Sequence, residues 1–391
     1  MLFSNIHKTQ DLIDPWRLVA DAMENEHTLD VNYRIKYTNL PACGPVPNYK
    51  VMKQLALQSQ LGWFYPFFVT MAPMAVLLAG PFNWILLLIG ITRTRRPPPP
   101  KPSCYIFSTT ENNTIVINAA LDADASITEA PRRKINLNLW SIGSELGWND
   151  FKSVVSEHLN LLLYVLKLPS YDRRDLILHG RDALALLCLV HLARNTESTF
   201  VTDDHYQRWA HVLSHSASDF RIVQHGFVDE KLILPKAGGR VSRLYIRDKA
   251  FLKLFKNYYS VIEYQIFSLS NTFAQIPESP GALMLASSFP SIDDEIEFLK
   301  TIRESFPELP IIVKFHPIHK YDYRRKVLAS YANVVYEKPC NPECKIFVSY
   351  SSFLEFEYRN RGVKVISIAR CGNAKAAANM VICYLNKNHD N

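Results

Sequence analysis

Two histidines each follow a short apolar run at which a β-strand is expected to end. His225 stands in residues 221–226 (RIVQHG), and His316 stands in residues 311–317 (IIVKFHP). Imidazole changes its charge near neutral pH, so a histidine at a strand end can accept a proton or contact a phosphate. Lys314, two residues before His316, adds a positive donor suited to a diphosphate. Each histidine alone is also compatible with a ring that only packs at a strand end.

A third segment passes from an expected strand (345–349) to an expected helix (353–361) through a serine-rich turn. Ser351 or Ser352 would cap that helix well. The N–H groups and the positive dipole end at a helix start suit a phosphate. Glu355 lies one turn into the helix, on the side at which it could meet a ribose hydroxyl. Without a ligand, the same residues would form an ordinary capped helix.

A pair of carboxylates, Asp203 and Asp204, follows another expected strand, residues 198–202. Either could act as an acid or a base near an acceptor. The alternative is a capping role for the helix expected over residues 204–214. Ligands of open α/β sheets bind beyond the carboxyl ends of strands, which is where all of these segments fall.

The order of these motifs resembles that of a known group of enzymes. Residues 345–362 (KIFVSYSSFLEFEYRNRG) are similar to a motif of CDP-glycerol glycerophosphotransferases, in which a strand, Thr-Asp-Tyr-Ser-Ser and a helix with an acidic residue follow one another. Gln224-His225-Gly226 looks like the His-Gly motif of that family, and His316-Pro317 looks like its His-Pro motif. The His-Pro and Ser-Ser pattern also resembles that of bacterial polysialyltransferases and capsule transferases. The resemblance covers residues 198–370.

This resemblance implies a GT-B fold, a nucleotide-activated donor and association with the inner membrane. It implies that the donor binds between His316 and the Ser351–Ser352 turn. It also implies that His225 acts as a general base or stabilises the leaving phosphate. No metal or other cofactor is expected, because the positive groups and the helix end would stabilise the phosphate. The family's aspartate before Tyr-Ser-Ser is Ser349 here, which argues against a strict glycerophosphate donor.

Strand-like and helix-like stretches alternate from Ser103 onward, which indicates an α/β fold with parallel sheets covered by helices on both faces. The expected strands are 104–107, 114–118, 198–202, 220–224, 241–246, 282–287, 310–315, 333–336, 345–349 and 363–368. The expected helices are 149–166, 182–193, 204–214, 292–306, 323–331, 353–361 and 374–384. Two Rossmann-like domains facing a cleft are therefore predicted, an acceptor domain over 103–238 and a nucleotide-donor domain over 239–391.

The preceding segment contains a long uncharged stretch. No Asp, Glu, Lys or Arg occurs in residues 54–92, which exceeds the length of about 20 residues that a bilayer span needs. Prolines 66, 73 and 81 interrupt it, and Gly80-Pro81 is a strong break point. Basic residues flank both ends, which favours a cytoplasmic position for both. A hairpin that dips into the membrane is favoured over one kinked span, and a buried helix pair of a soluble protein is the third alternative.

This pattern divides the first hundred residues into three parts. They are an N-terminal region (1–60), a membrane-associated hairpin or span (61–92) and a proline-rich linker (93–102) whose four consecutive prolines form a stiff spacer. The start of the chain lacks the apolar core of a signal peptide, so the cytoplasmic face of the inner membrane is the expected location.

Composition excludes several classes of protein. The 391 residues are 48% hydrophobic and 21% charged, which excludes a disordered chain. The net charge is +7 without a dense basic stripe, so no nucleic-acid partner is expected. P-loop and G-x-G-x-x-G motifs are absent, which argues against ATPase and NAD chemistry. Cys340 and Cys344 would need two further ligands to bind zinc, so reduced thiols are expected.

The predicted function is a membrane-associated glycosyltransferase, or a glycerophosphotransferase-like enzyme, of bacterial capsule or surface-polysaccharide synthesis. It would move a sugar or polyol phosphate from a nucleotide-activated donor to a lipid-linked or oligosaccharide acceptor. One alternative is a non-catalytic, transferase-like component of a polysaccharide assembly or export machine. Another is an epimerase of the same two-domain fold, which would not need the hydrophobic stretch.

Overall fold

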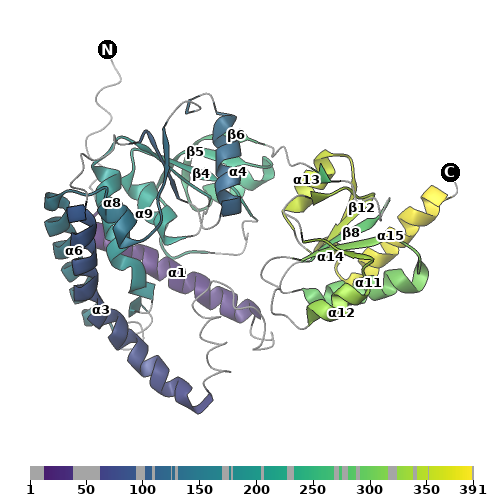
Figure 1. The fold of residues 1–391 in the computed structure, drawn as a ribbon, viewed down its shortest axis with the longest axis horizontal. Coiled ribbons are helices and arrows are strands. Elements are labelled where there is room, and N and C mark those ends of the chain that lie inside the picture. The colour runs from purple at the N-terminus through teal and green to yellow at the C-terminus, as the bar shows by residue number, and fades with distance from the viewer. Residues whose placement is uncertain are drawn as a thin grey trace. The chain divides into compact units, whose positions relative to one another are not determined.

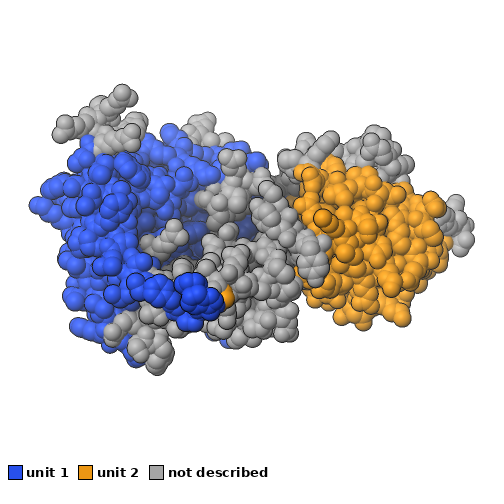
Figure 2. Space-filling model, turned by 60° about the horizontal axis from the view of Figure 1, so that its bottom comes forward, with its two compact units in different colours: residues 1–32, 63–267 blue, residues 33–62, 268–391 orange. Residues whose placement is uncertain are grey.

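The computed structural model describes residues 13–37, 62–93, 102–107, 111–124, 126–127, 131–169, 176–177, 179–203, 207–226, 233–267, 273–274, 281–287, 291–315, 324–337, 341–350 and 352–389. The chain forms two compact units (Figure 2). Unit 1 contains Met1–Asn32 and Trp63–Phe267, and unit 2 contains Tyr33–Gly62 and Ser268–Asn391.

Unit 1 is built on a six-stranded sheet in which every neighbouring pair of strands is parallel. In the order of the sheet, the strands are β2 (Arg132–Lys134), β1 (Cys104–Phe107), β3 (Thr199–Thr202), β4 (Asp219–Val223), β5 (Arg240–Ile246) and β6 (Ser260–Ile266). The chain moves from β1 outward to β2 and then returns to β3 on the other side of β1. The direction of winding therefore reverses between β1 and β3, where open α/β sheets bind ligands.

Helices cover this sheet (Figure 1). The helices of unit 1 are α1 (Pro15–Tyr37), α3 (Tyr65–Arg93), α4 (Glu111–Asp122), α5 (Leu139–Gly143), α6 (Trp148–Lys167), α8 (Ala183–Arg194), α9 (Arg208–Ser216) and α10 (Ala250–Lys256), with short 3₁₀ turns at Gly62–Phe64 and Gly180–Asp182. Helix α8 is buried over most of its length, from Ala183 to Ala193. Because both faces of the sheet are covered, the central strands consist mainly of buried residues, as parallel sheets require.

Unit 2 repeats this architecture with a five-stranded parallel sheet. In the order of the sheet, its strands are β10 (Val334–Val335), β9 (Ile311–Phe315), β8 (Leu283–Ser287), β12 (Ile346–Ser349) and β13 (Lys364–Ser367), and β7 (Phe273–Ala274) pairs separately with β11 (Asn341–Pro342). The helices are α11 (Ile292–Ser305), α12 (Arg324–Ser330), α13 (Leu354–Asn360), α14 (Ile368–Cys371) and α15 (Ala374–His389). The winding reverses between β8 and β12.

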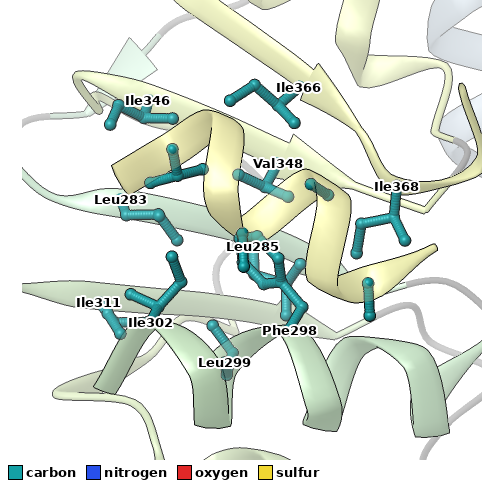
Figure 3. Packing of buried hydrophobic residues seen from close by; sticks show 14 of the residues in the cluster. Leu283, Leu285, Phe298, Leu299, Ile302, Ile311, Ile346, Val348, Ile366 and Ile368 are labelled. Atoms are coloured by element: carbon teal, nitrogen blue, oxygen red, sulfur yellow. The ribbon is translucent and has the colours of Figure 1, made fainter. Parts of the chain in front are cut away.

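The core of unit 2 lies between this sheet and helices α11 and α15. Leu283 and Leu285 of β8 and Ile311 of β9 are fully buried. Figure 3 shows Phe298 and Leu299 of α11 pointing toward the sheet. Together with the six-stranded sheet of unit 1, this core confirms the predicted α/β class with parallel sheets.

Three expectations about individual elements differ from the structure. Residues 114–118, expected as a strand, lie inside α4, where buried Ile117, Ala120 and Leu121 recur at helical spacing. The sheet of unit 1 continues through β5 and β6, so the boundary between the units follows Phe267 rather than residue 238. Strand β6 was not expected, because it has one neighbour and is mostly exposed.

A fourth difference concerns the uncharged stretch. Helix α3 runs for 29 residues through Pro66, Pro73 and Pro81, without the turn that the hairpin interpretation requires at Gly80-Pro81. Its second half packs on α5, where a Cβ added to Gly90 would lie 3.2 Å from the carbonyl oxygen of Leu139. By length and composition alone, Met74–Thr92 could cross a membrane.

Candidate active site

Asp203 and His225 come together at the carboxyl edge of the unit 1 sheet. Asp203 directly follows β3 and His225 follows β4, and these two strands pair in parallel. The His225 Nδ1 donates a hydrogen bond to the backbone carbonyl of Asp203, and it lies 3.8 Å from the Asp203 Oδ2. The Asp203 side chain is fully buried, whereas 30% of the His225 side chain is exposed. The pair thus combines an accessible ring with a buried carboxyl group.

This geometry determines which ring nitrogen can do chemistry. A carbonyl oxygen only accepts hydrogen bonds, so the Nδ1 of His225 carries the proton. In the neutral ring, the basic lone pair is therefore on Nε2. An oriented histidine supported by a carboxylate is the arrangement of a general base.

Gln224 holds the turn on which His225 stands. Its side chain is fully buried. The Nε2 donates to the Gly226 carbonyl at 3.1 Å, and the Oε1 accepts from the Arg247 backbone N–H at 3.2 Å. The first bond closes the turn around His225, and the second connects the segment after β4 to the residue after β5. Gln224 belongs to the His-Gly motif of the sequence, but its positioning role follows only from the structure.

Arg247, which follows β5 directly, places a cation at the same edge of the sheet. Its guanidinium lies 4.6 Å from the centre of the Phe267 ring. Arg247 is not among the site residues predicted from the sequence. The signal that could have found it is the one that found His225, a polar residue directly after an apolar strand.

The carboxyl edge of unit 2 carries two acidic residues in a different setting. At the end of β8, Ser287 Oγ donates to Glu295 Oε2 at 2.5 Å. At the end of the adjacent β12, Ser349 Oγ donates to Glu355 Oε1 at 2.8 Å. All four side chains are buried. Each bond joins a strand end to the first turn of the following helix, at the point where the winding of this sheet reverses.

The expected donor residues of the described chain are engaged in contacts within unit 2. Glu355 is 1% exposed, and its Oε2 lies 3.3 Å from Arg370 Nη2, so it points into the strand–helix junction rather than toward a ribose. Ser352 Oγ accepts from the Leu354 backbone N–H at 3.2 Å, just before α13, whose N-cap residue is Phe353. Lys314 Nζ donates to Asn341 Oδ1 at 3.0 Å. Residues Asp204, His316 and Ser351 lie outside the described residues.

A cavity of about 420 Å³ lies elsewhere in unit 1. It is lined by α3, the segment before α5 and the start of α8, through Ala75, Val76, Ala79, Asn83, residues 137–139, Asp182, Leu184 and Ala185. Neither Asp203 nor His225 lines it. Within the part of the chain that the structure describes, no group of three or more His, Cys, Asp or Glu side chains could hold a metal ion.

Comparison with models of protein families and with curated proteins gives no match to this chain. The likeness of residues 345–362 and of the two histidine motifs to glycerophosphotransferases and capsule transferases therefore stays a prediction from the sequence.

Proposed function

We propose that this chain is a GT-B type transferase of surface-polysaccharide synthesis that works at the cytoplasmic face of the inner membrane. Its donor would be a nucleotide-activated sugar or polyol phosphate, and its acceptor a lipid-linked or growing glycan. The single observation that carries the proposal is the Asp203–His225 pair, which lies at the carboxyl edge of a parallel sheet. The presence of a second, separately packed parallel α/β unit supports it.

In this proposal, unit 1 holds the acceptor and performs the proton transfer. His225 Nε2 takes the proton of an acceptor hydroxyl as the oxygen attacks the donor. A bond forms between that oxygen and the transferred group, and the bond between the transferred group and the nucleotide phosphate breaks. The nucleotide leaves with the electron pair. Asp203 stabilises the charged imidazole that results, and Gln224 keeps the ring in place.

Unit 2 would hold the donor beyond the carboxyl ends of β8 and β12. Lys314, His316, Ser351 and Ser352 are the proposed contacts of the phosphates. Glu355 is left out of this set, because its carboxyl group is buried and bonded to Ser349.

A second candidate function is a non-catalytic, transferase-like component of an assembly or export machine. The observation that favours it is that Lys314 and Ser352 already have partners within unit 2. The two candidates differ in turnover. An enzyme turns over a donor that it binds, whereas a non-catalytic, transferase-like protein binds at most the nucleotide.

The test begins with calorimetric titration of the full chain with CMP, CDP, UDP and GDP. Donors carrying the nucleotide that binds are then assayed for transfer to a lipid-linked acceptor. We expect His225→Ala to lower turnover by roughly 10²–10⁴, the contribution of a general base, with unchanged nucleotide affinity. His215→Ala, at the end of α9 and therefore at the opposite edge of the sheet, is the matched control. Nucleotide binding without turnover would favour the second candidate, and no binding would contradict both proposed roles of unit 2.

A further inference from the structure

Helix α3 exposes one continuous apolar stripe. Its most exposed large side chains recur every three or four residues, which places them on one face of the helix. We call this face the α3 stripe, and it consists of Phe67 (66% exposed), Met71, Met74, Leu78 (74%), Phe82, Ile85 and Ile89. Exposed Trp63 and Phe64 stand in the turn just before the helix. A soluble protein rarely leaves such a long apolar surface open to water.

The opposite face of α3 is fixed to unit 1. Leu87 is fully buried, and Gly80 and Gly90 are also buried. Trp84 Nε1 donates to His158 Nδ1 of α6 at 2.9 Å. In Figure 1, one end of α3 lies against the other helices of unit 1, and its other end extends beyond them. The helix can therefore not turn its stripe inward without breaking this packing.

The stretch of sequence that contains α3 carries only positive charge. Residues 31–110 contain eight of the chain's 44 Lys and Arg residues but none of its 37 Asp and Glu residues. The rest of the chain is close to neutral, so the net charge of +7 comes from this segment. The eight basic residues are Arg34, Lys36, Lys50, Lys53, Arg93, Arg95, Arg96 and Lys101. An apolar stripe within a purely basic segment complements a surface that offers hydrocarbon and negative charge together.

We propose that the α3 stripe lies in the plane of an anionic bilayer, with its apolar side chains inserted below the headgroups and unit 1 outside the membrane. The exposed Trp63 matches the preference of tryptophan for the headgroup level. A transmembrane orientation is incompatible with the packing of α3. The helix could cross only by taking α6 with it, and Lys152 and Glu157 lie within two turns of His158 on α6. Both would then enter hydrocarbon, where charged side chains are costly.

This inference deepens the membrane association in the proposed function, but it does not depend on the transfer reaction. It also selects a bilayer over a second copy of the chain, because two such basic segments would repel each other. Lipid binding is measured without a donor or an acceptor, so it can fail while turnover persists, and the reverse also holds.

The first experiment is flotation of the full chain with phosphatidylcholine vesicles, with and without one quarter phosphatidylglycerol. We expect binding to the anionic vesicles that weakens at high salt. The double substitution Leu78→Gln/Phe82→Gln should reduce partitioning at least tenfold. Its matched control is Ile262→Gln/Met380→Gln, which changes two exposed apolar residues on β6 and α15 and should bind within twofold of the natural chain. Equal binding by both double variants, or no binding by the natural chain, would overturn the proposal.

The second experiment measures depth. A fluorescent amino acid is placed in turn at Met71, Leu78, Phe82 and Ile89, and quenching is compared for lipids brominated near the headgroup or deep in the acyl chain. An in-plane helix places all four positions at the same shallow depth. A gradient with Leu78 and Phe82 deepest would show a spanning helix and overturn the proposal. Sedimentation in the absence of lipid that gives a stable dimer, lost in the Leu78→Gln/Phe82→Gln variant, would also overturn it, because the stripe would then bind a second copy.

Discussion

At the carboxyl edge of the unit 1 sheet, a buried carboxyl group faces a histidine, whereas at the same edge of unit 2 two carboxyl groups face serines. Asp203 supports a ring that is 30% exposed. Glu295 and Glu355 bond to Ser287 and Ser349, and all four are buried. Both settings arise from acidic residues close to the ends of parallel strands. The position of an acidic residue in the sheet topology therefore does not define its role, because its partner and its exposure decide whether it can act on a ligand.

The largest expected difference between the two units is a loss of stability of unit 1 at acid pH. Burial lowers the pKa of His158 to about 4, and it lowers the pKa of His211 to about 3. Both residues belong to unit 1. Below pH 6.5 the unfolded chain takes up protons that the folded unit does not, so this stability is present above pH 6.5 and is lost as the pH falls toward 4. His158 alone should cost on the order of 3 kcal/mol at pH 4.

Tryptophan fluorescence during urea unfolding checks this prediction, because all six tryptophans belong to unit 1. His158→Gln is the control, since an amide oxygen can still accept from Trp84 but does not titrate in this range. Its unfolding free energy should depend less on pH than that of the natural chain. Equal pH dependence in both proteins would show that His158 is not the titrating group.

Removing one hydroxyl from the unit 2 edge should give the next largest effect. Ser349→Ala leaves the buried Glu355 carboxyl without its serine donor. The unfolding free energy of unit 2 should fall by about 1–3 kcal/mol, the usual cost of a buried polar group that loses its partner. Far-UV circular dichroism reports on the helices and strands of both units, so unit 2 is followed as the part of its transition that tryptophan fluorescence does not show. The tryptophan transition of unit 1 should not move. Ser330→Ala, which changes an exposed serine on α12, should stay within about 0.5 kcal/mol of the natural chain.

The smallest effect is expected from Asp203→Asn. The backbone carbonyl of Asp203 holds the His225 ring, so the substitution should preserve its orientation while it removes a nearby negative charge. Turnover should fall by about tenfold, equivalent to about 1.4 kcal/mol. A loss as large as that of His225→Ala would instead show that the carboxylate does more than support the ring.

Much of the fold follows from local sequence patterns, because buried parallel strands are short apolar runs between turns. Residues 104–107 were expected as a strand and form β1, and the expected 241–246 corresponds to β5. Residues 114–118 contain β-branched residues but form part of α4, because the pattern of a core-facing helix extends beyond that window. Strand β6 is an edge strand that is mostly exposed, so it lacks the continuous apolar run of a buried strand. Its pairing with β5 arises only in the folded unit and cannot be seen in the local sequence.

The candidate site was predictable only in part. His225 and Asp203 were identified because both follow apolar strands, and parallel pairing of β3 with β4 then brings them together. The direction of the Glu355 side chain was not predictable, because a carboxyl group in a first helical turn can point toward a ligand or back to the strand. The rotation of α13 decides this, and packing of fully buried Tyr358 against Phe347 fixes that rotation.

A paired measurement of turnover and unfolding free energy in His225→Gln and Glu355→Gln tests most directly whether unit 1 performs the chemistry and the acids of unit 2 are structural. We expect His225→Gln to lower turnover at least a hundredfold, with an unfolding free energy within about 0.5 kcal/mol of the natural chain. Glu355→Gln should lower the unfolding free energy of unit 2 by about 1–3 kcal/mol, with turnover within a few-fold. The reverse pattern, an active His225→Gln and an inactive but fully stable Glu355→Gln, would contradict the assignment of chemistry to unit 1 and of a structural role to the acids of unit 2.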